Sequence, residues 1–164
     1  MTRSLGRSLP PALVERFSQR DLPARLGTAL TFVTVDEAGR PHPMLLSYLE
    51  LRAYDPGTLG LVIQSRSRSA RNLSARGVGT LIVAEPDGVF SVKCRALDGP
   101  LPVAGAEDLG YFLLAVEDVL EDAPADWEGG LRLIQPLAYA PAPDLGAPRV
   151  RATLAALAAP RARA

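Results

Sequence analysis

The amino-acid sequence predicts an α+β fold, mainly β, built on a small antiparallel β-barrel. Three observations favour this class: short β-prone runs follow one another at regular spacing, one helical pattern appears late in the chain, and no strand–helix–strand alternation is present. The chain has 164 residues, of which 48% are hydrophobic and 22% charged, so it is long enough to bury a core. We therefore expect one globular domain over residues 1–164.

The first half of the chain predicts a helix and then three strands. The stretch LPPALVERFSQ favours a short helix, because its prolines fall in the first turn, where a missing N–H is harmless. Strands are expected over 28–35, 44–51 and 59–64, since the turn sequences DEAGR and YDPGT separate three β-prone runs. The following segment SARNLSARG is expected to form another short helix.

The second half predicts two further strands, GTLIVAE and VFSVKCRAL, with Cys94 of the second facing the core and Lys93 facing outward. In AEDLGYFLLAVEDVLED, apolar residues recur at helical spacing, so we expect a crossover helix there. LRLIQPLAYA predicts a last strand and PRVRATLAALAAP a terminal helix. The barrel is thus expected to contain about six strands over about 26–140, with a C-terminal helix and basic tail over about 147–164.

Composition disfavours several classes of function. The formal net charge is zero, so no whole-molecule field attracts nucleic acid or an anionic membrane. Cys94 is the only cysteine, which excludes an internal disulfide and a cysteine-built zinc site and fits a reducing compartment. The N-terminus lacks the apolar core of a signal peptide, and no apolar run approaches the roughly 18 residues of a membrane span. We expect a cytoplasmic protein without a metal site, nucleic-acid partner or membrane partner.

The segment QSRSRSARNLSARG is the strongest functional signal, because its Ser/Arg alternation does not fit a hydrophobic core. A turn between a strand and a helix exposes unpaired N–H groups, which favour an anion. Ser67 and Ser69 can donate hydroxyls, Arg68 can present a bidentate fork, and Arg71 can add charge. These features predict a phosphate site, while the alternative interpretation is a solvated loop in an arginine-rich protein.

The order of these pieces resembles the flavin-binding split barrels of the pyridoxamine 5′-phosphate oxidase-like superfamily, from about Leu26 to Pro136. Three segments carry the resemblance: TVDEAGRPHPMLLSY, VIQSRSRSARNLSARGVGTLIV, and VFSVKCRALDGPL with the helix and strand expected after it. The resemblance implies an antiparallel split β-barrel that binds FMN at the interface of a homodimer. It also implies an FMN-dependent oxidoreductase acting on a small-molecule substrate that the sequence does not identify.

The resemblance further implies which residues contact the cofactor. The turn after the third strand would bind the phosphate, with Ser67 and Arg68 the best positions, while N–H groups of residues 44–47 would face the N1/O2 side of the ring. The implied cofactor-binding set is Met44, Leu45, Leu46, Ser47, Gln64, Ser65, Ser67, Arg68, Ser69, Arg71 and Lys93.

Departures from the family pattern keep alternatives open. Ser69 stands where the family commonly has a lysine, and Ser47 and Glu50 lie on the strand where the oxidase proper has basic residues. True pyridoxamine phosphate oxidation is therefore disfavoured, while FMN binding remains expected because Arg71 or Lys93 could supply the missing charge. The alternatives are a non-catalytic flavin-binding protein, a cofactor-free structural or regulatory dimer, and a deazaflavin-dependent reductase. No Ser/His/Asp or carboxylate-pair constellation assigns catalytic residues.

Overall fold

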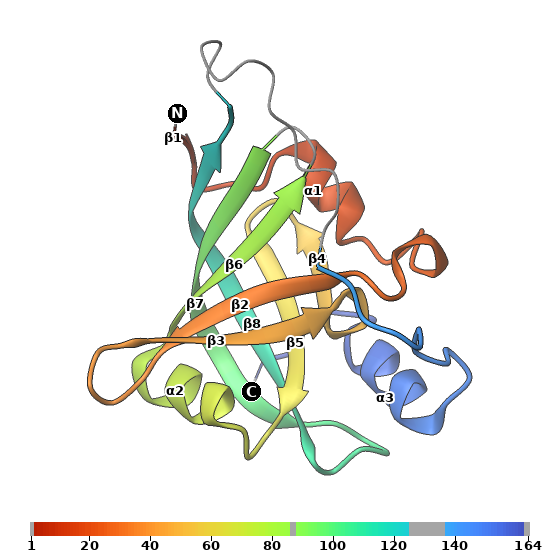
Figure 1. Ribbon diagram of the computed structural model, residues 1–164. Coiled ribbons are helices and arrows are strands. Elements are labelled where there is room, and N and C mark those ends of the chain that lie inside the picture. Colours follow the sequence, from red (N-terminus) through yellow and green to blue (C-terminus); the bar gives the residue numbers. More distant parts are fainter. Residues whose placement is uncertain (1, 86–87, 125–136, 163–164) are drawn as a thin grey trace.

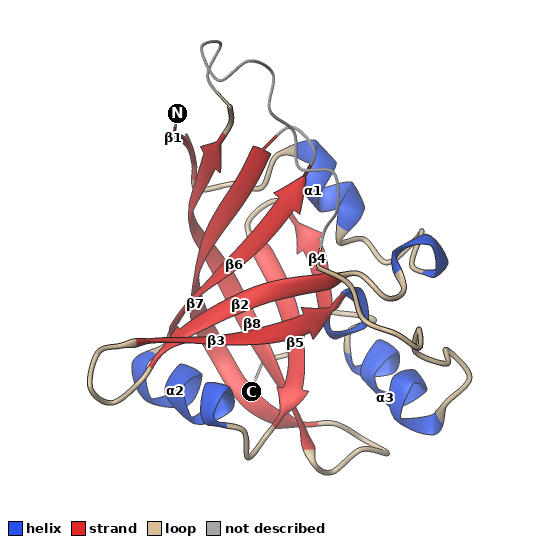
Figure 2. Cartoon of the chain, viewed as in Figure 1, coloured by secondary structure: helices blue, strands red, loops and turns tan. Residues whose placement is uncertain are grey.

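The computed structural model describes residues 2–85, 88–124 and 137–162, which form a coiled antiparallel sheet with helices around its rim (Figure 1, Figure 2). The strands are β1 (Thr2–Gly6), β2 (Ala29–Val35), β3 (Pro41–Ser47), β4 (Leu51–Asp55), β5 (Thr58–Gln64), β6 (Val78–Glu85), β7 (Gly88–Pro102) and β8 (Leu109–Asp122). The helices are α1 (Pro11–Arg16), α2 (Arg68–Arg76), α3 (Pro148–Ala156) and the short 3₁₀ turns η1 (Pro23–Arg25) and η2 (Tyr48–Glu50). The sheet order is β3-β2-β6-β7-β8-β5-β4, and β1 also pairs with β8.

The predicted α+β class with an antiparallel β core is confirmed. The opening helix, the helix after the third predicted strand and the terminal helix correspond to α1, α2 and α3. The alternation predicted for VFSVKCRAL is also correct, because Val92 and Cys94 are buried while Lys93 and Arg95 are exposed.

Residues 109–122 form strand β8, so the prediction of a crossover helix there is wrong. Both faces of its first half are covered: Phe112 and Leu114 lie in the main core, whereas Leu109 and Tyr111 lie in a second cluster on the opposite face. A strand buried on both faces reads as a nearly continuous apolar run, which periodicity alone does not separate from a helix. The apolar residues occurred at helical spacing because positions on both faces of the strand are apolar.

The strand expected over 44–51 is divided in two. β3 ends at Ser47, η2 turns the chain, and β4 begins at Leu51. β1 was not predicted. Most of the predicted last strand, together with Trp127, lies outside the described residues, although Ala138 makes a β-bridge to Thr28.

The inner face of the sheet encloses the main hydrophobic core, in which Phe32, Leu61, Leu81 and Phe112 are fully buried. These side chains come from four different strands, so the core is built from long-range pairings. Burying a large apolar side chain contributes about 1.5–3 kcal/mol. The core is therefore the main source of stability for the sheet.

A second hydrophobic cluster lies on the opposite face of β5 and β8. There Val62 and Tyr111 pack with Leu157, which directly follows α3. Tyr111 also hydrogen-bonds the hydroxyl of Tyr54 at 3.1 Å and accepts from the backbone N–H of Arg161 at 3.1 Å. This cluster holds the C-terminal segment against the barrel.

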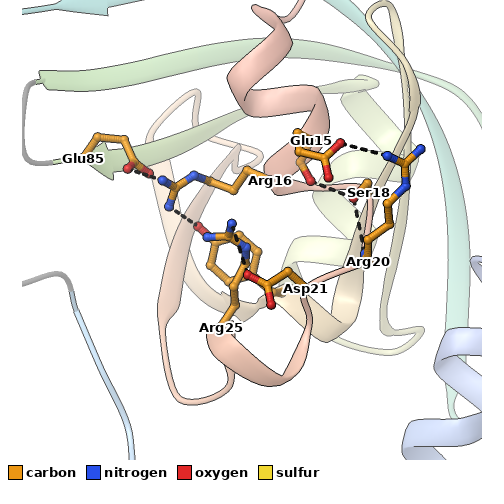
Figure 3. A network of polar contacts seen from close by, with 8 residues as sticks. Glu15, Arg16, Ser18, Arg20, Asp21, Arg25 and Glu85 are labelled. Carbon is orange, nitrogen blue, oxygen red and sulfur yellow. Dashed lines mark hydrogen bonds and ion pairs between the residues drawn. The ribbon is translucent and has the colours of Figure 1, made fainter.

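Polar contacts join α1 to the rim of the barrel (Figure 3). Arg16 forms an ion pair with Glu85 at the end of β6, and its guanidinium lies 3.5 Å from the hydroxyl of Tyr48. The Tyr48 ring stacks on Phe17 with 5.8 Å between ring centroids. The short helix is thus held by its contacts, since six residues are too few for a stable isolated helix.

In the described part of the chain, none of the helices has the length and apolar character that crossing a membrane requires.

The close approach of Gly79 to Phe32 gives a stability prediction. A Cβ at Gly79 would lie 2.3 Å from Cζ of the fully buried Phe32 ring. Because the ring has no free space to move into, Gly79→Ala should lower the free energy of unfolding by about 1–3 kcal/mol in urea denaturation.

Gly57→Ala is the matched control, because a Cβ there would meet only Asp55 Oδ1 at 3.5 Å. This substitution should change the free energy of unfolding by at most about 1 kcal/mol. Equal stabilities for the two variants would show that the Phe32 contact does not constrain position 79.

Candidate functional site

The turn between β5 and α2 carries the Ser/Arg segment. The backbone N–H of Ser67 donates to the carbonyl of Gln64 at 3.0 Å and closes the turn. Ser67 is also the N-cap of α2, where its Oγ accepts from the N–H of Ala70 at 3.1 Å. The N–H groups of Arg68 and Ser69 have no partner within the helix and are the donors that this turn offers to a ligand.

Buried hydrogen bonds fix α2 on the β2–β3 hairpin. The side-chain amide of Asn72 donates to Thr34 Oγ1 at 3.0 Å, and Thr34 Oγ1 lies 3.3 Å from the carbonyl oxygen of His42, to which it donates. Thr34 and Asn72 are both buried, so breaking these bonds would leave polar groups without water or protein partners. The first turn of α2 therefore has a defined position over the hairpin.

A cavity of about 280 Å³, called here the arginine cavity, lies between the β2–β3 turn and α2. It is lined by Asp36, Glu37, Ala38, Arg40, Arg68, Arg71 and Asn72. Three arginines face two carboxylates, so the excess positive charge is small. Any preference for an anion must therefore depend on which guanidinium groups are free.

Arg68 is the arginine of this cavity that makes no hydrogen bond or ion pair within the described residues. By contrast, Arg40 pairs with Asp36 at 3.5 Å, and Arg71 donates to the carbonyl of Arg66 at 2.6 Å. The backbone N–H of Arg40 is the main cause of the lowered pKa of Asp36, so this carboxylate stays ionised and holds the hairpin turn. Arg68 is left as the cation with its donors available to a ligand.

A larger cavity of about 410 Å³, called here the strand cavity, lies beside β3 and the end of β5. Its apolar lining consists of Met44, Leu45, Val62, Ile63 and Leu109. Its polar lining consists of Glu50, Gln64, Ser67, Arg149 and Thr153. Small-molecule sites typically have volumes of about 300–1,000 Å³, and this cavity lies in that range with apolar and polar residues in equal number on its wall.

Glu50 places a carboxylate on the wall of the strand cavity. Its Oε2 accepts from the backbone N–H of Ser47 at 2.6 Å and from the Ser47 hydroxyl at 2.9 Å. These bonds form the capping box of η2, which ends β3 and turns the chain into β4. Burial raises the pKa of Glu50, and the two Ser47 bonds oppose that rise.

The outer edge of β3 offers one backbone donor to the strand cavity. β3 is an edge strand, and N–H groups of alternate residues point away from β2. Ser47 belongs to the outward-pointing set, since its N–H bonds Glu50. The preceding members of that set are Leu45 and Pro43, and proline has no N–H. The Leu45 N–H is therefore the free donor on this edge.

The rim of the strand cavity is held together by Asp108. Arg149 Nη1 at the start of α3 donates to both carboxylate oxygens of Asp108, at 2.5 and 2.6 Å, which lowers the pKa of Asp108. The backbone carbonyl of Asp108 accepts from both the N–H and the hydroxyl of Ser65, at 2.9 and 3.0 Å. These contacts connect the turn after β5 to α3 across the rim.

The structure brings six of the predicted cofactor residues to the two cavities. Met44, Leu45, Gln64 and Ser67 line the strand cavity, and Arg68 and Arg71 line the arginine cavity on the other side of the first turn of α2. Whether these residues bind a cofactor stays a prediction.

The other five predicted residues line neither cavity. Leu46 and Ser69 are buried, with 1% and 3% of their surfaces exposed. Ser47 and Ser65 are bonded within the chain as described above. Lys93 forms an ion pair of 3.1 Å with Asp118 on the outer face of β7. From that position Lys93 could serve a cofactor only across a subunit interface.

Glu50, Arg149 and Thr153 line the strand cavity without having been predicted. The position of Glu50 depends on η2, which divides a run that reads as one strand. Arg149 and Thr153 belong to a helix that is far away in sequence, and no local pattern indicates where it docks. The described residues contain no group of three or more His, Cys, Asp or Glu side chains that could hold a metal ion.

No protein-family model matches the sequence, and no curated protein matches it. The fold, by contrast, has many similar solved structures. A candidate pyridoxamine 5′-phosphate oxidase from Lactobacillus delbrueckii is 16% identical, with a TM-score of 0.56 over 71% of this chain and 98% of that one.

Two further solved structures are similar to this chain. Tagged HupZ from group A Streptococcus is 12% identical, with a TM-score of 0.53 over 71% of this chain and 99% of that chain. An FMN-binding protein from Syntrophomonas wolfei is 13% identical, with a TM-score of 0.49 over 70% of this chain and 89% of that chain. At these identities the likeness concerns the fold. This chain has a split β-barrel fold similar to that of the candidate pyridoxamine 5′-phosphate oxidase.

Proposed function

We propose that the protein is an FMN-binding flavoprotein and an oxidoreductase acting on a small-molecule substrate. The observation that carries the proposal is the pair of cavities on either side of the first turn of α2. One is the larger and has an apolar side, formed by Met44, Leu45, Val62, Ile63 and Leu109, against which a flavin ring could pack. The other presents the unpaired Arg68 guanidinium, as a phosphate requires. The shared fold with a candidate pyridoxamine 5′-phosphate oxidase supports this assignment.

The residues present fit FMN with one departure from the family pattern. The ring would lie in the strand cavity against Met44 and Leu45, and the phosphate near the free N–H groups of Arg68 and Ser69. The side chain of Ser69 is buried, so it does not replace the lysine common in the family. Phosphate binding would depend on Arg68, on the Ser67 hydroxyl and on the helix N-terminus.

The chain's own residues would hold and enclose the cofactor. A bound flavin supplies hydride transfer, while the protein supplies position and electrostatics. The Leu45 N–H would donate to the N1/O2 side of the ring, where it favours negative charge. The contacts between Asp108 and Arg149 keep α3 over the rim, which limits the access of water to the strand cavity.

A homodimer would complete the site. Leu45 is 61% exposed on the outward surface of β3 and also lines the strand cavity. It continues a row across the sheet through Thr31 of β2 and Ile82 of β6, and no described helix crosses this surface in Figure 1. A two-fold pair of such surfaces would cover Leu45 and Ile82, which are the apolar members of this row, and would close the cavity over a flavin.

The anion site predicts a selective effect of Arg68→Ala. Loss of a charge-assisted hydrogen bond worth about 1.5–3 kcal/mol should weaken FMN binding about ten- to a hundredfold. Riboflavin has the same ring but no phosphate, so its affinity should hardly change. Titrations followed by flavin fluorescence measure both affinities.

Arg66→Ala is the matched control, because Arg66 is exposed in the same segment but lines neither cavity. It should leave both affinities within about threefold of the original protein. Equal losses for FMN and riboflavin in Arg68→Ala would contradict phosphate binding at this turn. Failure of the original protein to bind FMN would favour a cofactor-free barrel, and binding of a deazaflavin instead would favour a deazaflavin-dependent reductase.

The dimer predicts that the purified protein has twice the mass of one chain in light scattering at micromolar concentration. Ile82→Glu should shift the mass to that of a monomer, because a carboxylate would be buried in the apolar row. Ala84→Glu, on the same strand but at its exposed end, should remain a dimer. A monomeric mass for the original protein would refute the assembly.

A further inference from the structure

The Glu50 carboxylate has one oxygen committed to the fold and one free. Both of its hydrogen bonds, from the N–H and the hydroxyl of Ser47, end on Oε2. Oε1 accepts no hydrogen bond from the described residues, although Glu50 lines the strand cavity. The Arg149 charge acts on this carboxylate, but no described residue hydrogen-bonds Oε1, so this oxygen can accept a hydrogen bond from a ligand in the cavity.

The free N–H of Leu45 on β3 lies five residues before Glu50, whose Oε1 is the free acceptor. Leu45 and Ser47 belong to the same outward-pointing set of the edge strand, and Glu50 is bonded to Ser47. The Leu45 N–H and Glu50 Oε1 thus present a donor and an acceptor to the same cavity. A cyclic amide or imide carries the complementary pair, a carbonyl oxygen beside an N–H.

We propose that Glu50 and Leu45 recognise the imide edge of the flavin, with Glu50 Oε1 accepting from the ring N3–H and the Leu45 N–H donating to the neighbouring O2. This inference rests on the proposed function and deepens it, because it assigns to Glu50 the choice of cofactor by a hydrogen bond to N3. Glu50 is thereby a specificity-determining residue for the ligand.

The chemistry of a carboxylate makes this recognition selective. An ionised carboxylate accepts hydrogen bonds and donates none, so it favours a ligand with an N–H at that position. A ligand that carries a methyl group there would leave Oε1 buried without a partner. Sites built around such a hydrogen bond discriminate strongly against analogues that lack it.

The test compares FMN with N3-methyl-FMN, using the full chain and flavin fluorescence to measure dissociation constants. The original protein should bind FMN about ten- to a hundredfold more tightly than the N3-methyl compound. Glu50→Gln should lower this ratio to about threefold or less. The glutamine carbonyl can still accept from Ser47, so its NH₂ group faces the cavity, where it opposes a ligand N–H.

Two control measurements separate the role of Glu50 from effects on folding and on overall charge. Thermal unfolding of Glu50→Gln checks that η2 is intact. Glu107→Gln removes an exposed carboxylate that does not line the cavity and should keep the original ratio. If Glu50→Gln discriminates as strongly as the original protein, steric crowding explains the ratio and the role of Glu50 is wrong. If the original protein binds both compounds equally, only this inference fails, whereas binding of neither overturns the proposed function and the inference with it.

Discussion

The double-sided burial of β8 is the constraint on which the rest of the structure depends. This strand pairs with β1, β5 and β7, so it joins the N-terminus to both halves of the sheet. One of its faces contributes Phe112 to the main core, and the other contributes Tyr111 to the cluster that holds the end of α3. α3 in turn carries Arg149 and Thr153 to the strand cavity. The burial of β8 therefore determines the shape of this cavity, although β8 itself lines it only through Leu109.

Local sequence patterns predicted a helix or strand correctly where one face of that element is polar. The alternation around Cys94 and the short helix after β5 are properties of a few neighbouring residues, and both were predicted correctly in kind. The error at 109–122 arose in the first half of the strand, where packing on both faces removes the polar positions that distinguish a strand from a helix. The division of 44–51 at η2 depends on one side chain, Glu50, bonding back to Ser47, and hydrophobic spacing carries no sign of that bond.

The site was predictable to the extent that it lies on one contiguous stretch. Gln64, Ser67, Arg68 and Arg71 belong to the β5–α2 turn, so their proximity follows from the turn itself. The rim contact between Asp108 and Arg149 joins residues 41 positions apart, and its formation depends on tertiary packing. Sequence reasoning therefore brought together the residues of the β5–α2 turn and missed Glu50 and Arg149, the charged groups of the strand cavity.

The edge position of β3 has a consequence for solubility. An uncovered edge strand usually exposes a row of N–H groups that can pair with a strand of another molecule and seed aggregation. Along PHPMLLS the outward-pointing positions are Pro41, Pro43, Leu45 and Ser47; the prolines have no N–H, and the Ser47 N–H is taken by Glu50. Only the Leu45 N–H remains as a donor on this edge. One donor is enough for a small ligand but too few for pairing with a strand of another molecule. The same residues that define the ligand edge thus protect the barrel from strand addition.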